Sequence, residues 1–125
     1  MPSNRYRPVV IVLVLLAIAG CHKAEKPLPA ERVAEYNAVF AGAKWTAETQ
    51  KKWARSCALC HVAGQGGAPR LGHPDEWAPR LEQGKALLLA HTLDGYNKMP
   101  PLGYCMDCEM SDFAAMINMM SGDKR

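Results

Sequence analysis

The stretch "SCALCHVAGQGGAPRLG", residues 56–72, contains two cysteines three residues apart, a histidine directly after the second, and then a run of glycines and a proline. On a helix, residues at i, i+3 and i+4 project from one face, so Cys57, Cys60 and His61 are expected to point the same way. The glycines and Pro69 then prevent the helix from continuing. A zinc site, a redox dithiol and a covalently attached haem can all begin with this cysteine spacing.

The first 20 residues of the 125-residue chain predict an export signal rather than part of the fold. Arg5 and Arg7 precede an unbroken apolar run at residues 9–19. Those eleven apolar residues would rise only about 16 Å as a helix, well short of the roughly 30 Å bilayer core. The junction Ile18–Cys21, "IAGC", resembles a bacterial lipobox, where the chain is cut before a cysteine that carries lipid. The alternative is an ordinary signal peptide with an incidental Cys21.

We therefore predict a lipoprotein signal peptide over residues 1–20, a lipidated tether with a short helix over residues 21–45, and a folded domain over residues 46–125. Several acyl chains on Cys21 would give stable anchoring at the periplasmic face of a membrane, where one chain would not. Loss of Arg5 and Arg7 lowers the formal net charge from +3 to about +1. So balanced a charge, without blocks of like charge, argues against nucleic-acid binding.

Apolar periodicity and capping residues predict an all-α fold of short helices with long ordered loops. Thr46, Asp75 and Ser111 are the expected N-caps, and Pro100 and Pro101 exclude helix from the segment 96–104. About 80 residues from Thr46 onward cannot bury a large core, and such domains usually need a staple or a cofactor. The expected helices run over residues 30–41, 46–60, 75–83, 85–93 and 111–120.

The remaining cysteines discriminate between zinc and haem. With Cys21 assigned to lipid, the other four form two pairs of the same spacing, Cys57/Cys60 and Cys105/Cys108. A four-thiolate zinc site usually has about 15 to 20 residues between its pairs, whereas 44 residues separate these two. Zinc would also leave His61 unexplained. We therefore predict one haem c, attached through thioether bonds to Cys57 and Cys60, with His61 as an iron ligand.

Met99 is the predicted sixth ligand of the iron. It stands in a loop whose shape is restricted by Pro100 and Pro101, and the residue before a proline is held extended. Met116 and Met120 share a helical stripe with other apolar residues and are predicted to be packing residues. His73, in a loop, and His91, on an apolar helix, are alternative sixth ligands.

Five motifs follow one another along the chain: "CALCH", "GAPRLG", "WAPRLEQG", "GYNKMPP" and "GYCMDC". Together, and in that order, they resemble the class I cytochromes c, and specifically the cytochrome c-five group. The resemblance covers residues 46–120 and implies the cytochrome c fold, with His61 and Met99 on opposite faces of the haem. Residues 46–125 would then be a cytochrome c domain.

The resemblance also assigns roles around the haem. It implies that the carbonyl of Pro69 accepts a hydrogen bond from His61, which orients the ligand. It implies that Trp77 and Arg80 lie near the haem propionates. It further implies a disulfide between Cys105 and Cys108, for which a thioredoxin-like dithiol is the alternative.

The chain departs from the family pattern at two positions. Met119 stands where an aromatic residue commonly packs the last helix on the first, and Trp53 replaces a usual tyrosine or phenylalanine. Neither change touches ligation of the iron. The packing between these helices is the property that they place in question.

These predictions describe a one-electron carrier that makes and breaks no substrate bond. Its partners would be redox proteins, a donor and an acceptor such as a membrane-bound reductase or oxidase, docking weakly near the exposed haem edge. The alternatives are a haem sensor with a displaceable sixth ligand and a thiol or Cu(I) module built on the methionine-rich end. Four lysines are candidates for a ring around the docking patch: Lys51, Lys52, Lys85 and Lys98.

Overall fold

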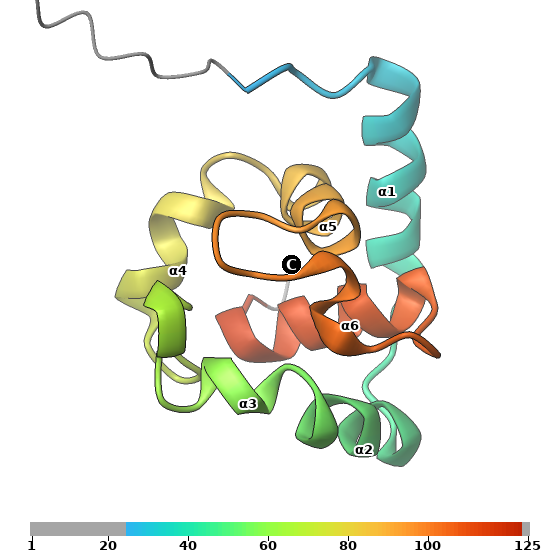
Figure 1. The fold of residues 1–125 in the computed structure, drawn as a ribbon. Coiled ribbons are helices and arrows are strands. Elements are labelled where there is room, and N and C mark those ends of the chain that lie inside the picture. Colours follow the sequence, from blue (N-terminus) through green and yellow to red (C-terminus); the bar gives the residue numbers. More distant parts are fainter. Residues whose placement is uncertain (1–24, 124–125) are drawn as a thin grey trace, which may run out of the picture.

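The computed structural model describes residues 25–123, and in this part of the chain it contains helices and no strand (Figure 1). The predicted all-α fold is therefore confirmed. The signal peptide and Cys21 lie outside the described residues. The elements are α1 (Ala30–Gly42), α2 (Ala47–Arg55), α3 (Ala58–His61), the 3₁₀ turn η1 (Gln65–Gly67), α4 (Pro74–Leu81), α5 (Lys85–Asp94), the 3₁₀ turn η2 (Pro101–Tyr104) and α6 (Met110–Ser121).

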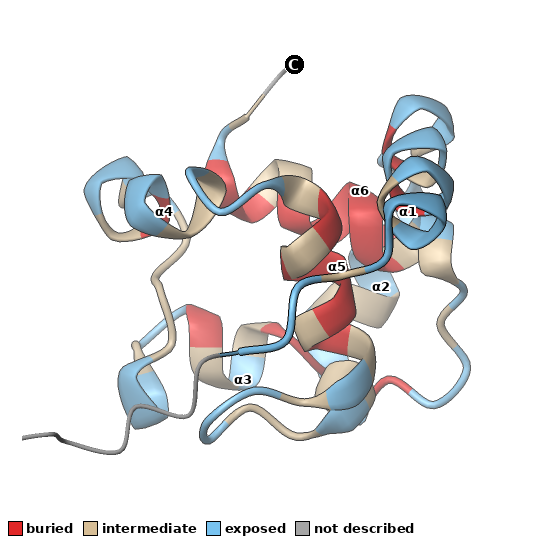
Figure 2. Cartoon of the chain, turned by 90° about the horizontal axis from the view of Figure 1, so that it is seen from above, coloured by how far each residue is buried: buried red, intermediate tan, exposed pale blue. Residues whose placement is uncertain are grey.

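Helices α5 and α6 form the centre of the fold, and the buried residues concentrate on their facing sides (Figure 2). The apolar stripe expected on the last helix is buried, with Phe113 and Met116 among the largest fully buried side chains. Leu89 of α5 packs in the same core as Phe113. The apolar positions in the sequence thus predict which face of each helix is buried, because burial of apolar side chains is the main free-energy gain available to the fold.

Helix α1 packs against α5 and α6 instead of standing apart as part of a tether. Its Tyr36 and Phe40 are 4% and 9% exposed and belong to the main core, against which Leu28 also packs. Ala30–Gly42 matches the helix expected over residues 30–41 almost residue for residue. The helix lies inside the segment treated as a tether, so the packed part of the chain begins before residue 46.

The expected helix over residues 46–60 is divided into α2 and α3. Thr46 caps α2 as predicted, since its side chain accepts a hydrogen bond of 3.1 Å from the Thr49 amide. The break falls at Ser56, where the backbone leaves the helical region and the hydroxyl donates to the Lys52 carbonyl at 2.7 Å. A second short helix therefore carries Cys60 and His61 at a new angle.

The predicted caps Asp75 and Ser111 are wrong. Helix α4 begins at Pro74, a residue favoured at the first helical position because it lacks an N–H that would have no partner there. Helix α6 begins two residues earlier than predicted, with Glu109 as its N-cap in a capping box. The Glu109 side chain accepts from the Asp112 amide, and the Asp112 side chain accepts from the Glu109 amide.

Asp112 also fastens α2 to α6. Its carboxylate accepts hydrogen bonds from Lys52 Nζ at 2.7 Å and from Thr49 Oγ1 at 3.3 Å. Lys52 is thus engaged inside the fold. Trp53 and Met119, the two departures from the family pattern, both pack against the buried cluster that contains Met116 and Met120.

We expect Asp112→Ala to lower the free energy of unfolding by about 1–2 kcal/mol at neutral pH, through loss of the cap and of the bonds to α2. Burial acts to raise the pKa of Asp112, but the bonds from Lys52, the Glu109 amide and Thr49 outweigh it and lower that pKa. The difference from wild type should therefore be full above the ordinary aspartate pKa of about 3.9 and shrink as the pH falls below it.

Urea unfolding at pH 7 and pH 3 measures this effect. Glu82→Ala removes an exposed carboxylate after α4 and is the matched control, expected to change stability little at either pH. If Asp112→Ala were as stable as wild type at pH 7, the bonds of Asp112 between α2 and α6 would not contribute to stability.

Candidate functional site

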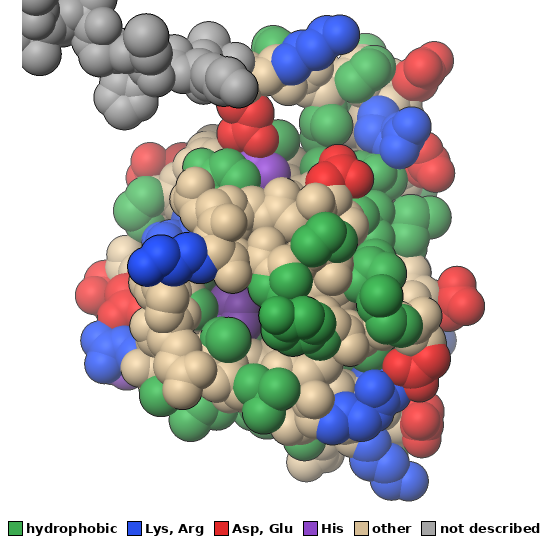
Figure 3. Space-filling model, in the orientation of Figure 1, with side chains coloured by type: hydrophobic (Ala, Val, Ile, Leu, Met, Phe, Trp, Pro, Cys, Tyr) green, Lys and Arg blue, Asp and Glu red, His purple; other side chains and the backbone are tan. Residues whose placement is uncertain are grey.

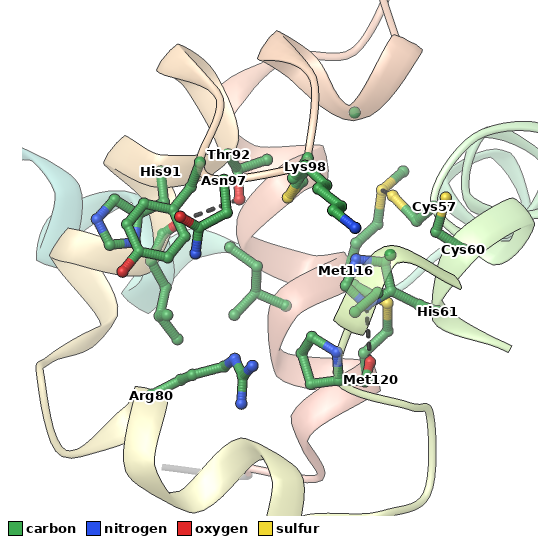
Figure 4. A pocket seen from close by; sticks show the side chains of 18 of the residues that line it. Cys57, Cys60, His61, Arg80, His91, Thr92, Asn97, Lys98, Met116 and Met120 are labelled. Carbon is green, nitrogen blue, oxygen red and sulfur yellow. Dashed lines mark hydrogen bonds between the residues drawn. The ribbon is translucent and has the colours of Figure 1, made fainter. Parts of the chain in front are cut away.

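A cavity opens between α3, α4, α5, α6 and the segment 96–104 (Figure 4). It encloses about 1170 Å³ of space, counted out to its open mouth. All seven predicted cofactor residues line it: Cys57, Cys60, His61, Pro69, Trp77, Arg80 and Met99.

His61 is held rigidly at the wall of this cavity. It is 6% exposed, and its Nδ1 donates to the Pro69 carbonyl at 2.8 Å (Figure 4), which leaves Nε2 available to a metal. Its ring stacks on Trp77, with centroids 5.7 Å apart and an angle of 20° between the planes. Burial, and to a lesser degree Arg80, lower the pKa of His61 against the opposing effect of Pro69. The imidazole is thus kept neutral, the form that ligates a metal.

Cys57 and Cys60 precede His61 on one turn of backbone and are both free thiols. The His61 and Cys60 amides both donate to the Cys57 carbonyl, at 2.9 and 3.2 Å, which fixes the turn. Burial raises the pKa of the Cys57 thiol. Its sulfur lies 3.6 Å from Met116 Sδ, so Met116, expected to be a packing residue, also lines the cavity.

Trp77 and Arg80 reach the cavity from α4, but their donors are partly taken. The buried Trp77 donates its indole N–H to the Arg70 carbonyl at 2.9 Å, so that N–H is not free for a propionate. Arg80 donates to the Glu76 carbonyl at 2.5 Å and keeps other N–H groups. Glu76 in turn binds the Arg70 side chain, which lowers the pKa of Glu76 to about 2.

The segment 96–104, here called the Met99 loop, closes the cavity with a tight turn. Tyr96 and Met99 exchange backbone hydrogen bonds of 3.0 and 2.9 Å. The three non-glycine residues with positive φ among residues 25–123 are Asn97, Leu102 and Tyr104, all in this loop. Such conformations persist only where the surroundings impose them. The loop is thus a strained turn followed by η2, within the extended-or-turn structure expected from its prolines.

A disulfide joins Cys105 to Cys108 directly after the Met99 loop. With these two sulfurs bonded to each other, a four-thiolate zinc site with Cys57 and Cys60 cannot form. Cys105 is fully buried, which also leaves little access for a thioredoxin-like exchange reaction. Between them, Asp107 pairs with Arg55 of α2 through two hydrogen bonds of 2.6 and 2.8 Å.

The two alternative histidine ligands differ in position. His73 is absent from the cavity lining and lies 3.9 Å from Glu76. His91 does line the cavity, but its Nε2 is paired with Glu25 and its ring stacks on Tyr96. Thr92 and Asn97 also line the cavity, although neither was predicted to do so. Asn97 lies within the motif "GYNKMPP", but nothing in the residue type of either side chain indicated a role at the cavity.

The residues of this cavity fit a covalently attached haem. Two free thiols and a neutral imidazole share one turn at its wall, and a thioether from a separate loop lines the same space. The family model described as cytochrome c oxidase, cbb3-type, subunit III matches residues 44–120. The chain belongs to the class I cytochromes c.

Similar proteins agree with this assignment. A cytochrome c5 of Azotobacter vinelandii is 41% identical over 71 residues, 55% of this chain and 86% of that protein. A cytochrome c5 of Ectopseudomonas mendocina is 39% identical over 71 residues, 55% and 82% of the two chains. A chain in the crystal structure of an electron transfer complex of nitrite reductase with cytochrome c superposes with a TM-score of 0.57 at 33% identity, covering 66% of this chain and all of that one.

This class I cytochrome c therefore adopts the cytochrome c fold and binds haem c covalently through Cys57 and Cys60. It transfers electrons through that haem. The cavity geometry shows how a short chain accommodates so large a group. The haem would add apolar contacts to the core that α1, α5 and α6 already form.

Proposed function

We propose that this cytochrome is a one-electron carrier with His61 and Met99 as axial ligands, tethered to the periplasmic face of a membrane through lipid on Cys21. When bound, the haem supplies an iron that accepts one electron and gives it back. The observation that carries the proposal is the presence of His61, with Nε2 free, and of Met99 in the lining of one cavity.

His61 and Met99 would contribute differently to the iron. His61 is neutral and oriented by Pro69, so it can donate a lone pair through Nε2 without rearranging. Met99 would supply a soft thioether, which favours the reduced state and raises the potential relative to a second histidine. With both axial positions filled by protein, no position is left for a substrate or for O2, which favours a carrier over an enzyme or a gas sensor.

The other predicted sixth ligands and metal sites are less favourable. His91 already uses Nε2 for Glu25, and His73 is outside the cavity lining. Met116 and Met120 are buried, with 1% and 4% of their surface exposed to solvent. This burial argues against a Cu(I) site that takes up its metal from solvent.

The face around the cavity mouth suits weak docking of a redox protein. Figure 3 shows hydrophobic side chains gathered around a histidine near the centre of this face. Exposed apolar residues occur close to the haem attachment turn and in the Met99 loop, at Leu59, Val62 and Tyr104. Small apolar interfaces of this kind are typical of transient electron-transfer encounters. The complex of nitrite reductase with cytochrome c shows a structural relative engaged with a redox enzyme.

The expected lysine ring is smaller than the sequence indicates. Lys52 is bound to Asp112, and Lys85 is bound to Asp123 and Asn118. Lys98 lines the cavity in the Met99 loop and Lys51 remains exposed. Any basic steering of a partner near the cavity would therefore fall mainly to Lys98.

A lipid on Cys21 would hold the domain close to the membrane. No helix within residues 25–123 has the length and hydropathy needed to cross a bilayer. Glu25 is paired with His91 and Leu28 packs on the core. Cys21 lies four positions before Glu25, a span of at most about 14 Å when fully extended. Such a tether confines the carrier to its partners' surface instead of raising its affinity for them.

Cys21→Ser is expected to convert the cytochrome from a detergent-phase protein to one recovered in the aqueous phase of a phase partition. The absorption spectra of both redox states should be unchanged, since the substitution is far in sequence from the haem residues. Ser3→Ala is the control outside the lipobox. Partition of the Cys21 variant into detergent would contradict lipid attachment at this residue.

A redox titration of the purified protein in the presence and absence of carbon monoxide tests the carrier itself. A single one-electron transition that carbon monoxide does not shift is the expected result. A ferrous spectrum that changes at once on addition of carbon monoxide would instead support the sensor alternative.

A further inference from the structure

His91 joins two parts of the chain that lie far apart in sequence. Its Nε2 forms a hydrogen bond with the Glu25 carboxylate, in the segment before α1. Its ring stacks flat on Tyr96, with centroids 3.9 Å apart and only 13° between the planes. The His91 side chain is 13% exposed and the Glu25 side chain is 45% exposed, so the contact is partly open to water. We call these three residues the Glu25 clasp.

The clasp lies at the polar end of the cavity. In Figure 4, His91 and Arg80 lie at the end away from Cys57 and Cys60, with Thr92 and Asn97 beside His91. The haem is attached at the cysteine end, so the contacts at the polar end are not needed for attachment. They act on the loop that begins there.

Tyr96 is the residue through which the clasp reaches Met99. It exchanges two backbone hydrogen bonds with Met99. Further along the loop, Leu102 and Tyr104 have strained positive-φ conformations. The far end of the loop is fastened by the disulfide and by Asp107 on Arg55. The near end is fastened by the loop's own backbone bonds, by the packing of η2 against α5, and by the stacking of Tyr96 on His91. Of these, the stacking is the contact made by the side chain of Tyr96.

We propose that His91, held by Glu25, is a positioning residue that keeps the Met99 loop closed over the haem. The proposal rests on Met99 as the axial ligand, and it makes the segment before α1 part of the redox site. Glu25 fixes the plane of the imidazole, the imidazole fixes Tyr96, and Tyr96 holds Met99 through the paired backbone bonds. Loss of the Glu25–His91 bond or of the His91–Tyr96 stacking loosens the loop and leaves the attachment of the haem to Cys57 and Cys60 unchanged.

Imidazole binding to the ferric holoprotein measures how readily Met99 leaves the iron. Stacked aromatic pairs contribute enough that His91→Ala should raise the apparent affinity for imidazole about three- to tenfold. Glu25→Ala should raise it about two- to fivefold, as expected for loss of a partly exposed hydrogen bond between two side chains. His91→Phe keeps a ring against Tyr96 and should restore most of the difference. Glu31→Ala, an exposed carboxylate in the first turn of α1, is the matched control.

Amide hydrogen exchange supplies a second readout that does not depend on a ligand. The Met99 and Gly103 amides, which donate within the loop, should exchange faster in His91→Ala and Glu25→Ala by about the same factors. The amides of α6 should be unaffected. A general loss of stability would accelerate both sets, whereas a positioning role accelerates the loop alone.

The outcomes separate the clasp from the proposed function. A wild-type protein without a sulfur-to-iron charge-transfer band would overturn Met99 ligation and the clasp with it. A wild-type protein that has the band, with His91→Ala and Glu25→Ala variants that bind imidazole and exchange amides as wild type does, would overturn the clasp alone. Faster exchange throughout α6 in both variants would also overturn it.

Discussion

Met99→Leu is expected to abolish the far-red sulfur-to-iron band of the ferric cytochrome and to lower its reduction potential substantially. Leucine has nearly the volume of methionine but no sulfur, so the cavity stays filled while the sixth ligand is lost. Axial ligands set haem potentials over a span of about 0.8 V, so a change on the order of 100 mV or more is expected. Absorption spectra and a potentiometric titration measure both effects.

Met116→Leu is the matched control for this substitution. Met116 is buried in the wall of the same cavity, and its sulfur lies close to Cys57 Sγ. If Met99 is the ligand, Met116→Leu should keep the band and shift the potential only slightly. The reverse pattern, with the band lost in Met116→Leu and kept in Met99→Leu, would assign the axial sulfur to α6.

Gly95→Ala is expected to lower the free energy of unfolding by about 2–4 kcal/mol and to release the Met99 loop. Gly95 has a φ of 85°, which costs alanine about 1 kcal/mol or more. A Cβ there would also lie 3.0 Å from the Pro101 ring and backbone nitrogen and 3.1 Å from the Met99 carbonyl. Backbone atoms yield little, and overpacking of this kind costs about 1–3 kcal/mol more.

Gly72→Ala separates the two contributions. Gly72 has nearly the same φ, 78°, but a Cβ there would meet nothing within 4 Å. This variant should lose only the backbone part, about 1 kcal/mol, and should keep the spectrum of the wild type. Denaturant unfolding of the two holoproteins gives the comparison. Equal losses in both variants would mean that the approach of Gly95 to the Met99 loop does not hold the loop in place.

The helices that carry long apolar stripes could be predicted from the sequence because their burial dominates the free energy of folding. Helix α5 was expected over residues 85–93 and runs over Lys85–Asp94. The ends of helices were less predictable. The first expected helix breaks at Ser56, whose hydroxyl donates to the Lys52 carbonyl. Asp112 completes the capping box of α6 and also accepts a hydrogen bond from Lys52. Both features depend on side-chain contacts that periodicity does not encode.

The site divides in the same way. Cys57, Cys60 and His61 act within one turn, so their spacing alone predicts their common direction. Met99 could be selected because two prolines follow it and restrict its loop. The hydrogen bond between Glu25 and His91 joins residues 66 positions apart. The bond from the Trp77 indole N–H to the Arg70 carbonyl depends on how α4 packs. No local pattern specifies either contact.

Two measurements on the purified wild-type protein test whether one attached haem is held between His61 and Met99: haem staining after denaturing electrophoresis, and then the ferric absorption spectrum. We expect the haem to stay with the polypeptide and the spectrum to show a far-red sulfur-to-iron band at neutral pH. A haem-stained protein with no such band, whether high-spin or ligated by two histidines, would contradict ligation by His61 and Met99.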